Sequence, residues 1–375
     1  MRRVVAAGAV AVAAFFGYLL AEPVLRPSVV VLLFHRTPDF EPVAAYLEHR
    51  GYTTLSLEQL REFLRGRLRV PPRSVVLTFD DADATNFLGA AEPLRRHGLR
   101  GVFFVLTDRL GAGPPRELRT AAGDPQAPAD TVRDAPPDAD LWAALHPGRP
   151  DPWSLRWSEV RRLAAAGHDI ASHTATHHFA FASSRLLGFT GQPTWRQVDA
   201  LGGVAGRGAP LFPGGGSLLH PEFRPDPAML RALIRAAERH PGPLPVDSLG
   251  AIVRTFSAAG RAGRMESAAE YEARLGRELA GSRDRLEDSL ARPVTALAWP
   301  WGTHTRALRE RARRAGYTLI FSVEPGACVR GSDSLEVPRA VARPDTVELR
   351  RVLVIFSRPL LGRIYGWLHP PTYPR

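Results

Sequence analysis

Short apolar segments that are typical of buried strands alternate with helix-like segments along this chain. The expected strands cover residues 28–34, 75–79, 102–106, 169–172, 295–299, 318–323 and a segment near 335–338. The expected helices cover residues 42–50, 57–65, 84–97, 155–166, 267–290 and 305–315. Strand–helix repetition favours a parallel sheet, and with this many units a barrel is the natural closure. We therefore predict an α/β fold built on a barrel-like parallel sheet.

Three segments break the alternation. Residues 110–152 are rich in Pro, Gly, Ala and Asp, which predicts a long surface loop. Clustered glycines in residues 202–216 predict a flexible loop, which could also cover the mouth of a site. Residues 352–368 predict a packing helix, with a membrane-surface patch as the alternative. Although 375 residues allow two domains, we favour one domain with insertions.

The N-terminal residues indicate a targeting segment. Arg2 and Arg3 precede eighteen uncharged, mostly apolar residues from Val4 to Ala21, and a bilayer-spanning helix needs roughly 20. We predict that residues 1–25 are a signal anchor or a signal peptide, since a buried core helix is unusual at such a position. No clear Ala-x-Ala site follows the run, which favours a retained anchor over a cleaved leader and a secreted protein. The arginines would keep the amino end in the cytoplasm and the rest of the chain outside.

Composition excludes several classes of function. The net charge is +11, and all 49 basic residues are Arg, because the sequence contains no Lys. This excludes a Walker-type phosphate loop and lysine Schiff-base chemistry. The arginines are interspersed with acidic residues and no nucleic-acid module is recognisable, so we expect no nucleic-acid partner. The only cysteine, Cys328, cannot form an intramolecular disulfide. The sequence also lacks the Gly-x-Ser-x-Gly elbow of many serine hydrolases.

Potential metal ligands follow two of the expected strands. Asp80 and Asp81 come directly after one buried strand. His173 and His177 follow another, and His178 is an alternative to His177. Two imidazoles and one carboxylate suit Zn²⁺ or a similar divalent ion, and positions left to water are typical of a catalytic site. The plainer interpretation is that the aspartates form a turn or a helix cap and that the histidines lie on a solvated surface.

These motifs resemble those of a known family. The Thr-Phe-Asp-Asp motif at residues 78–81 and the His-Thr-x-x-His motif at residues 173–177 are similar to motifs of the polysaccharide deacetylase superfamily, carbohydrate esterase family four. Its members remove N- or O-acetyl groups from polymers such as chitin, peptidoglycan and poly-N-acetylglucosamine. Residues 156–167 resemble the helix that leads into the histidine motif, and residues 298–302 resemble the family's aromatic-Pro-aromatic-Gly segment.

The order of the motifs resembles one branch of this family. Residues 33–35, Leu-Phe-His, resemble a Leu-x-His motif that most members carry near the end of the domain and the poly-N-acetylglucosamine branch carries first. This order favours the permuted branch, with a poly-N-acetylglucosamine-like exopolysaccharide as substrate and peptidoglycan as the next alternative. The resemblance covers roughly residues 28–350 within an expected catalytic domain of residues 26–375. Its weak stretches, near 107–153 and 180–262, are interpreted as insertions.

The resemblance implies a fold and a mechanism. The fold would be a distorted, incomplete (β/α)₇ barrel, preceded here by the apolar N-terminal helix. The barrel would bind one divalent metal ion through Asp81, His173 and His177, with Zn²⁺ as first choice and Co²⁺, Ni²⁺ or Mn²⁺ as alternatives. Asp80 would be the general base and His35 the general acid in removing N-acetyl groups from an N-acetylhexosamine-containing polysaccharide at the cell envelope. His35 could instead simply end a strand. The rival function is a non-catalytic carbohydrate-binding or envelope scaffold protein on a deacetylase fold.

The resemblance also implies a substrate wall. Trp299, Pro300 and Trp301 would hold the sugar ring and the acetyl methyl group, since aromatic faces suit the C–H faces of carbohydrates. Ordinary core packing is the alternative for these three residues. Arg339, which resembles a later arginine of the family, is assigned with the substrate-binding residues.

Two positions depart from the family pattern. Most relatives carry Gly after the paired aspartates, whereas this chain has Ala82, which disfavours positive φ. We therefore predict a right-handed turn there or a slightly altered site. Many members place an Arg ahead of the Pro-aromatic-Gly segment to orient the base aspartate, whereas Leu297 and Ala298 stand here. Arg339 would serve instead.

Overall fold

The computed structural model describes residues 17–18, 21–22, 27–116 and 139–369. Its centre is a parallel sheet in which seven strands follow the order β13-β12-β5-β4-β3-β1-β14, and β2 pairs with β3 beside this path. The strands are β1 (Val30–Phe34), β2 (Thr53–Thr54), β3 (Ser74–Phe79), β4 (Gly101–Val105), β5 (Asp169–Ser172), β12 (Ala296–Ala298), β13 (Leu319–Phe321) and β14 (Ala340–Val341). One isolated β-bridge joins Phe321 of β13 to Val337, shortly before β14, so the two edges of the sheet almost meet to close a barrel. The predicted incomplete α/β barrel is therefore confirmed.

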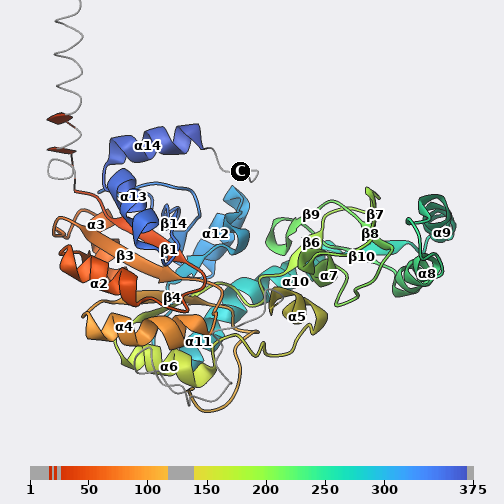
Figure 1. The fold of residues 1–375 in the computed structure, drawn as a ribbon, viewed down its shortest axis with the longest axis horizontal. Coiled ribbons are helices and arrows are strands. Elements are labelled where there is room, and N and C mark those ends of the chain that lie inside the picture. Colours follow the sequence, from red (N-terminus) through yellow and green to blue (C-terminus); the bar gives the residue numbers. More distant parts are fainter. Residues whose placement is uncertain (1–16, 19–20, 23–26, 117–138, 370–375) are drawn as a thin grey trace, which may run out of the picture.

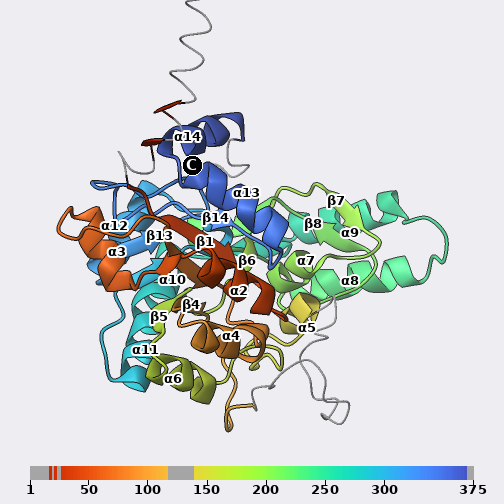
Figure 2. The same ribbon diagram turned by 60° about the vertical axis from the view of Figure 1, so that its left-hand side comes forward.

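Helices surround the outside of this sheet (Figures 1 and 2). They are α2 (Glu41–His49), α3 (Leu57–Leu64), α4 (Ala91–Arg96), α6 (Trp157–Ala165), α10 (Ala268–Gly276), α11 (Ser282–Leu290), α12 (Arg306–Arg314), α13 (Thr346–Phe356) and α14 (Pro359–Leu368). Helix α3 illustrates how the sequence determines where these helices form. Its buried residues include Leu57, Leu60 and Leu64, which share one face, and a capping box between Ser56 and Gln59 satisfies donors at its first turn.

The core of the barrel contains a row of aromatic side chains. The ring centroids of Phe34 and Phe79 are 5.7 Å apart, and those of Phe79 and Phe103 are 4.7 Å apart. All residues of β1, β3 and β4 are buried. Strands covered on both faces are expected to be continuously apolar, as these largely are.

Two predicted helices differ from the structure in the same way. The helix predicted at residues 84–97 starts as a π-helical turn, η1 (Asn86–Ala90), before α4. The helix predicted at residues 267–290 is divided by a second π-helical turn, η4 (Arg277–Gly281), between α10 and α11. Such turns are rare and occur often at functional sites. Hydrophobic periodicity does not reveal them, because one extra residue in a turn barely changes an amphipathic pattern.

A lobe with its own core extends from one side of the barrel (Figure 1). It contains the sheet β11-β10-β6-β9 and the pair β7-β8. Its elements are β6 (Phe179–Phe181), β7 (Gly188–Thr190), α7 (Trp195–Ala200), β8 (Ala209–Leu211), β9 (Gly214–Gly216), β10 (Phe223–Pro225), α8 (Pro227–Glu238), α9 (Val246–Ala258) and β11 (Gly263–Met265). The lobe coincides with the weak stretch near residues 180–262.

The loop predicted at residues 202–216 is wrong for its second half, because residues 209–211 and 214–216 form β8 and β9, whereas residues 202–208 are turn and coil. Its glycines permit close packing instead. A Cβ atom on Gly214 would lie 2.6 Å from the Ala180 carbonyl oxygen, and one on Gly216 would lie 2.7 Å from Cδ1 of Trp301. The surface loop predicted at residues 110–152 contains the helix α5 (Ala139–Leu145), and its residues 117–138 lie outside the described part of the chain.

The two ends of the chain bear on the membrane predictions. Helix α13 packs on the core through Leu349, Val352, Leu353 and Phe356, so the packing interpretation holds for this helix. The predicted apolar helix at Val4 to Ala21 falls mostly outside the described residues. Within the described ranges, no helix is long and apolar enough to cross a membrane.

A substitution at a buried position of the lobe tests whether the lobe has a packed core. Leu233 on α8 is fully buried, so Leu233→Ala should cost about 2–5 kcal/mol of the free energy of unfolding. The control Val246→Ala, at a side chain that is 57% exposed, should change it by no more than about 0.5 kcal/mol. Urea unfolding monitored by circular dichroism would measure both. An unchanged midpoint in Leu233→Ala would contradict the lobe core.

Candidate metal centre and active site

The end of β3 presents two carboxylates through a strained turn. The Asp80 N–H donates to the Phe34 carbonyl oxygen at 2.9 Å, which continues the pairing of β3 with β1. Asp81 and Ala82 then adopt φ values of 66° and 55°. The right-handed turn predicted at Ala82 is therefore wrong. A left-handed alanine costs roughly 1–2 kcal/mol, and the surrounding contacts must offset this, among them the bond from the Leu155 N–H to the Ala82 carbonyl oxygen at 2.7 Å.

The end of β5 presents the histidines in a similar way. Thr174 and His177 have φ values of 69° and 59°, so the loop after β5 is also strained, as is common at functional sites. The His173 Nδ1 atom lies 2.9 Å from the Ala298 carbonyl oxygen. As a donor to that oxygen, Nδ1 carries the proton and leaves the Nε2 lone pair free for a ligand role.

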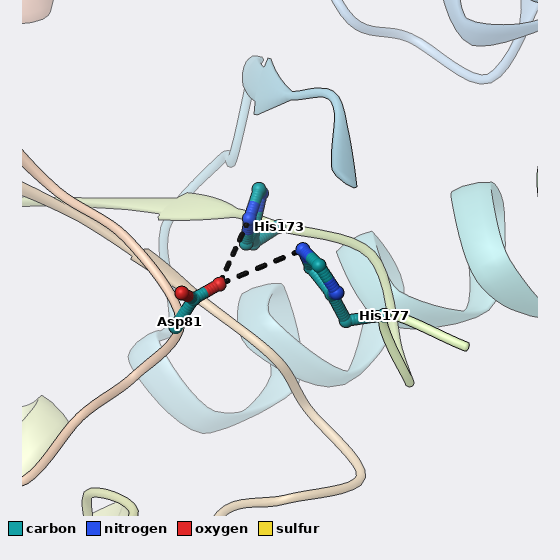
Figure 3. Close-up of side chains that lie close together, drawn as sticks. All are labelled: Asp81, His173 and His177. Carbon is teal, nitrogen blue, oxygen red and sulfur yellow. Dashed lines mark ion pairs between the residues drawn. The ribbon is translucent and has the colours of Figure 1, made fainter. Parts of the chain in front are cut away.

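Asp81, His173 and His177 converge from the two strand ends (Figure 3). Their candidate ligand atoms all lie within 4.8 Å of one another. Oδ1 of Asp81 is 3.3 Å from Nε2 of His173 and 3.6 Å from Nε2 of His177. One carboxylate oxygen and two imidazole nitrogens are a donor set that suits Zn²⁺ and related divalent ions. These residues therefore fit the metal ion that the sequence analysis expects.

The electrostatics of the cluster favour a bound cation. Burial lowers the pKa of His177 to about 3, so its imidazole is neutral and free to coordinate. Burial raises the pKa of Asp81, but the three neighbouring histidines hold it well below its usual value. Burial also lowers the pKa of His173, yet the carboxylates of Asp80 and Asp81 raise it overall. The carboxylates of Asp80 and Asp81 thus favour a positive charge, such as a divalent cation, at this site.

Asp80 lies beside the cluster but belongs to a different pair. Its Oδ1 accepts a hydrogen bond from Nη1 of Arg339 at 2.8 Å, while its Oδ2 lies 3.8 Å from Nε2 of His173. Arg339 is fully buried, and its Nε donates to the Ser322 carbonyl oxygen at 2.8 Å. As predicted, Arg339 orients Asp80 in place of the missing arginine. Because it is buried, it does not line the surface that a substrate would meet.

His35 approaches the cluster from the solvent side. It follows β1 directly, and its Nε2 lies 4.0 Å from Oδ2 of Asp81. Half of its side-chain surface is exposed. The ring is therefore accessible to a molecule that sits over Asp81.

One family model matches part of the chain. Residues 67–199 match the family model described as polysaccharide deacetylase. This part of the chain is therefore similar to polysaccharide deacetylases. The matched region contains both aspartates at the end of β3 and both histidines of the cluster. No curated protein matches the sequence.

Two solved structures resemble the fold over most of its length. One is the BpsB deacetylase domain from Bordetella bronchiseptica, with 18% identity, a TM-score of 0.52, and coverage of 84% of this chain and 96% of that chain. The other is a de-N-acetylase from Aggregatibacter actinomycetemcomitans, with 17% identity, a TM-score of 0.54, and coverage of 87% and 99%. At such identities the similarity shows a shared fold.

The structure separates the two tryptophans of the expected substrate wall. Trp299 is buried in the core and stacks on His304, and Pro300 is also buried. Trp301 is half-buried, and its ring centroid lies 4.5 Å from that of His177. Of these three residues, Trp301 is the one whose side chain borders the cluster.

His178 is not part of the cluster. Its Nδ1 lies 2.9 Å from Oδ1 of Asp199, and its Nε2 lies 3.7 Å from Oε1 of Glu222. Burial lowers the pKa of His178, but Asp199 and Glu222 raise it overall. Both of its ring nitrogens thus face carboxylates that lie outside the cluster. The structure therefore favours His177 over the alternative.

Sequence reasoning missed the residues that hold the site in place. Oε2 of Glu278 accepts hydrogen bonds from the N–H groups of Ala175 and Thr176 at 2.9 and 3.2 Å. Its Oε1 accepts one from the Thr176 hydroxyl at 2.7 Å. Asn86 donates from Nδ2 to the Asp80 carbonyl oxygen at 3.1 Å. Glu278 and Asn86 both lie in π-helical turns, and no signal in the sequence marks those turns.

The lobe also reaches the site. Trp195 stacks on Trp301 with ring centroids 5.4 Å apart, and the Arg196 guanidinium lies 4.9 Å above the Trp301 ring. Sequence reasoning missed both residues because they lie in the stretch near 180–262, where the sequence analysis found only a weak resemblance. The lobe thus completes the aromatic border of the cluster.

Loss of a ligand should release the metal ion. Asp81→Asn removes a carboxylate charge while Asn still tolerates positive φ, and His173→Ala removes an imidazole. Each variant should bind far less than the roughly one divalent ion per chain expected for the wild type. His178→Gln should retain it and is the matched control. Metal analysis after gel filtration measures this, and unchanged stoichiometry in both ligand variants would refute the assignment.

Proposed function

We propose that this protein removes N-acetyl groups from an N-acetylhexosamine-containing polysaccharide by metal-dependent hydrolysis. The observation that carries the proposal is the position of Asp80, which lies against the cluster of Asp81, His173 and His177 but is held separately by Arg339. A general base needs a carboxylate that is not one of the metal ligands but is held in a fixed position beside them. The match of residues 67–199 to the polysaccharide deacetylase family model supports the class of reaction.

Amide hydrolysis needs an activated water, a stabilised oxyanion and a proton for the departing amine. When bound, a divalent ion supplies Lewis acidity that polarises the acetyl carbonyl group and lowers the pKa of water. Zn²⁺ is our first choice because of the two imidazole ligands, with Co²⁺, Ni²⁺ and Mn²⁺ as alternatives.

Asp80 takes the proton of the attacking water. Arg339 holds Oδ1 of Asp80, so Oδ2 is the oxygen that faces His173 and the cluster. Because Arg339 is itself fixed by Ser322, the carboxylate needs little reorganisation when water binds.

His35 donates a proton to the leaving nitrogen. Its ring lies at the exposed edge of the cluster, 4.0 Å from Asp81 and next to the space that a polymer would enter. Trp301 borders the same edge beside His177, where its ring can hold a sugar or the acetyl methyl group.

We infer that the polymer resembles poly-N-acetylglucosamine. The support is the position of His35 after the first strand of the barrel, ahead of the aspartates, which is the motif order of that branch. The structural neighbour described as a de-N-acetylase agrees with N-deacetylation. The alternative of a non-catalytic carbohydrate-binding scaffold predicts loss of a ligand or of the base, yet every one of these residues is present.

We further propose that the catalytic domain lies outside the cytoplasm and is tethered by its N-terminal segment. Arg2, Arg3 and the apolar run from Val4 to Ala21 support this location. The envelope polymer proposed as the substrate would be accessible there.

The two acid–base roles can be separated by substrate. Asp80→Asn should lower acetate release from N-acetylglucosamine oligomers by about 10²–10⁴-fold while the metal ion stays bound. His35→Ala should also keep the metal ion but slow the expulsion of the amine. Its defect should shrink on an activated aryl acetate ester, because that leaving group needs no proton.

Acetate release with and without chelator, together with metal analysis of each variant, would measure these effects. The role of His35 would be refuted by equal impairment on amide and ester, or by wild-type activity on both. Loss of metal from Asp80→Asn would show that Asp80 is a ligand rather than the base.

Retention of the N-terminal segment predicts the location of the protein. The full-length chain should remain with membranes after a high-salt wash, because an apolar helix is not displaced by screening of charge. Detergent should release it at full length. Recovery of a shortened, freely soluble form would show that the segment is a cleaved signal peptide instead.

A further inference from the structure

The last described helix, α14, turns its large apolar side chains toward solvent. Ile364, Trp367 and Leu368 are 39%, 81% and 59% exposed. Together with the partly exposed Leu360 they lie at helical spacings of four, seven and eight residues, so they share one face. Scattered exposed apolar residues are ordinary, but a clustered face of this kind marks a contact surface.

The opposite face of α14 packs against the rest of the protein. The Tyr365 ring packs edge-on against Phe356 of α13 with centroids 5.3 Å apart. A Cβ atom on Gly362 would lie 3.3 Å from Phe356, and one on Gly366 would lie 3.5 Å from the Pro325 carbonyl oxygen. Glycines let this face approach closely, so the orientation that exposes Trp367 is set by packing.

The charge of this region suits an anionic surface. Glu348 is the last acidic residue of the chain, and five arginines follow it. Arg363 is exposed on α14, next to the apolar face. Basic side chains beside Trp and Leu are the composition of helices that lie in the interface of an anionic bilayer.

The N-terminal segment is fixed beside the same helix. Oε1 of Glu22, a buried carboxylate, accepts a hydrogen bond from the Leu360 N–H at 3.0 Å and one from the Tyr18 hydroxyl at 3.3 Å. The Ser28 hydroxyl donates to the Ser357 carbonyl oxygen at 3.0 Å. In both views the described residues before residue 23 lie on the side of the molecule that carries α14 (Figures 1 and 2). The apolar run of the N-terminal segment therefore ends at the first turn of α14.

We propose that the apolar face of α14 docks on the surface of an anionic lipid bilayer, next to the point where the N-terminal segment enters it. This inference rests on the proposed membrane location. One tether alone would leave the barrel free to tilt, whereas a tether and an adjacent interfacial helix give it one orientation.

A probe on α14 tests this docking in the full-length protein. Cys328 is fully buried, and burial raises the pKa of its thiol to about 12, so an introduced cysteine can be labelled selectively. Leu368→Cys and the control Val246→Cys, on exposed α9 of the lobe, would each carry an environment-sensitive fluorophore. Both proteins would be reconstituted in vesicles of phosphatidylglycerol and phosphatidylcholine that contain a lipid-linked nitroxide quencher.

The fluorophore at position 368 should be quenched by the nitroxide several-fold more than that at position 246. It should also be shielded from aqueous iodide, and quenching should fall in vesicles of phosphatidylcholine alone. Ile364→Ser combined with Trp367→Ser should abolish the difference while acetate release is unchanged.

Three results would overturn the proposal. Protein that stays in vesicles while position 368 is as accessible to iodide as position 246 would refute docking and leave the tether intact. Shielding from iodide without nitroxide quenching would identify a protein partner, such as a second copy of this chain, as the occupant. Protein that does not stay with vesicles at all would refute both docking and the membrane location, while the proposed hydrolysis would be judged separately by acetate release.

Discussion

The buried ion pair between Asp80 and Arg339 is the interaction on which the site depends. Asp80 directly follows β3, whereas Arg339 comes just before β14, far along the chain. Breaking a buried pair of this kind typically costs about 3–5 kcal/mol, because the remaining charge is left without a partner. The pair also joins the segment that nearly closes the barrel to the carboxylate proposed as the base. The segment that nearly closes the barrel therefore also holds the proposed base in place.

The sequence was sufficient to predict the sheet and the three candidate ligands. Parallel strands bring their carboxyl ends to one edge, so motifs that follow β3 and β5 had to meet there. Local rules failed where tertiary contacts override them. Ala82 adopts the left-handed conformation despite its Cβ atom, and the glycines of residues 214–216 form a strand because they lie against neighbouring groups.

The supporting residues could not be predicted, for a related reason. Glu278 binds the histidine loop across about a hundred positions of sequence, and only the π-helical turn η4 aligns it. Trp195 reaches Trp301 from a lobe whose position follows from packing and not from any motif. Trp299 is the opposite case, a residue assigned to the site that does not border it. The family-like segment predicted a substrate contact, whereas the fold buries the side chain.

The insertion point of the lobe has a mechanical consequence. The lobe begins at Phe179, two residues after His177, and its last strand ends at Met265, shortly before the helix that leads into Glu278. Its entrance thus continues from a candidate ligand, and its exit leads to the residue that braces the ligand loop. A displacement of the lobe would therefore be transmitted along the backbone to the loop that carries His177. The position of the lobe and the position of a candidate ligand are in this way coupled through the backbone itself.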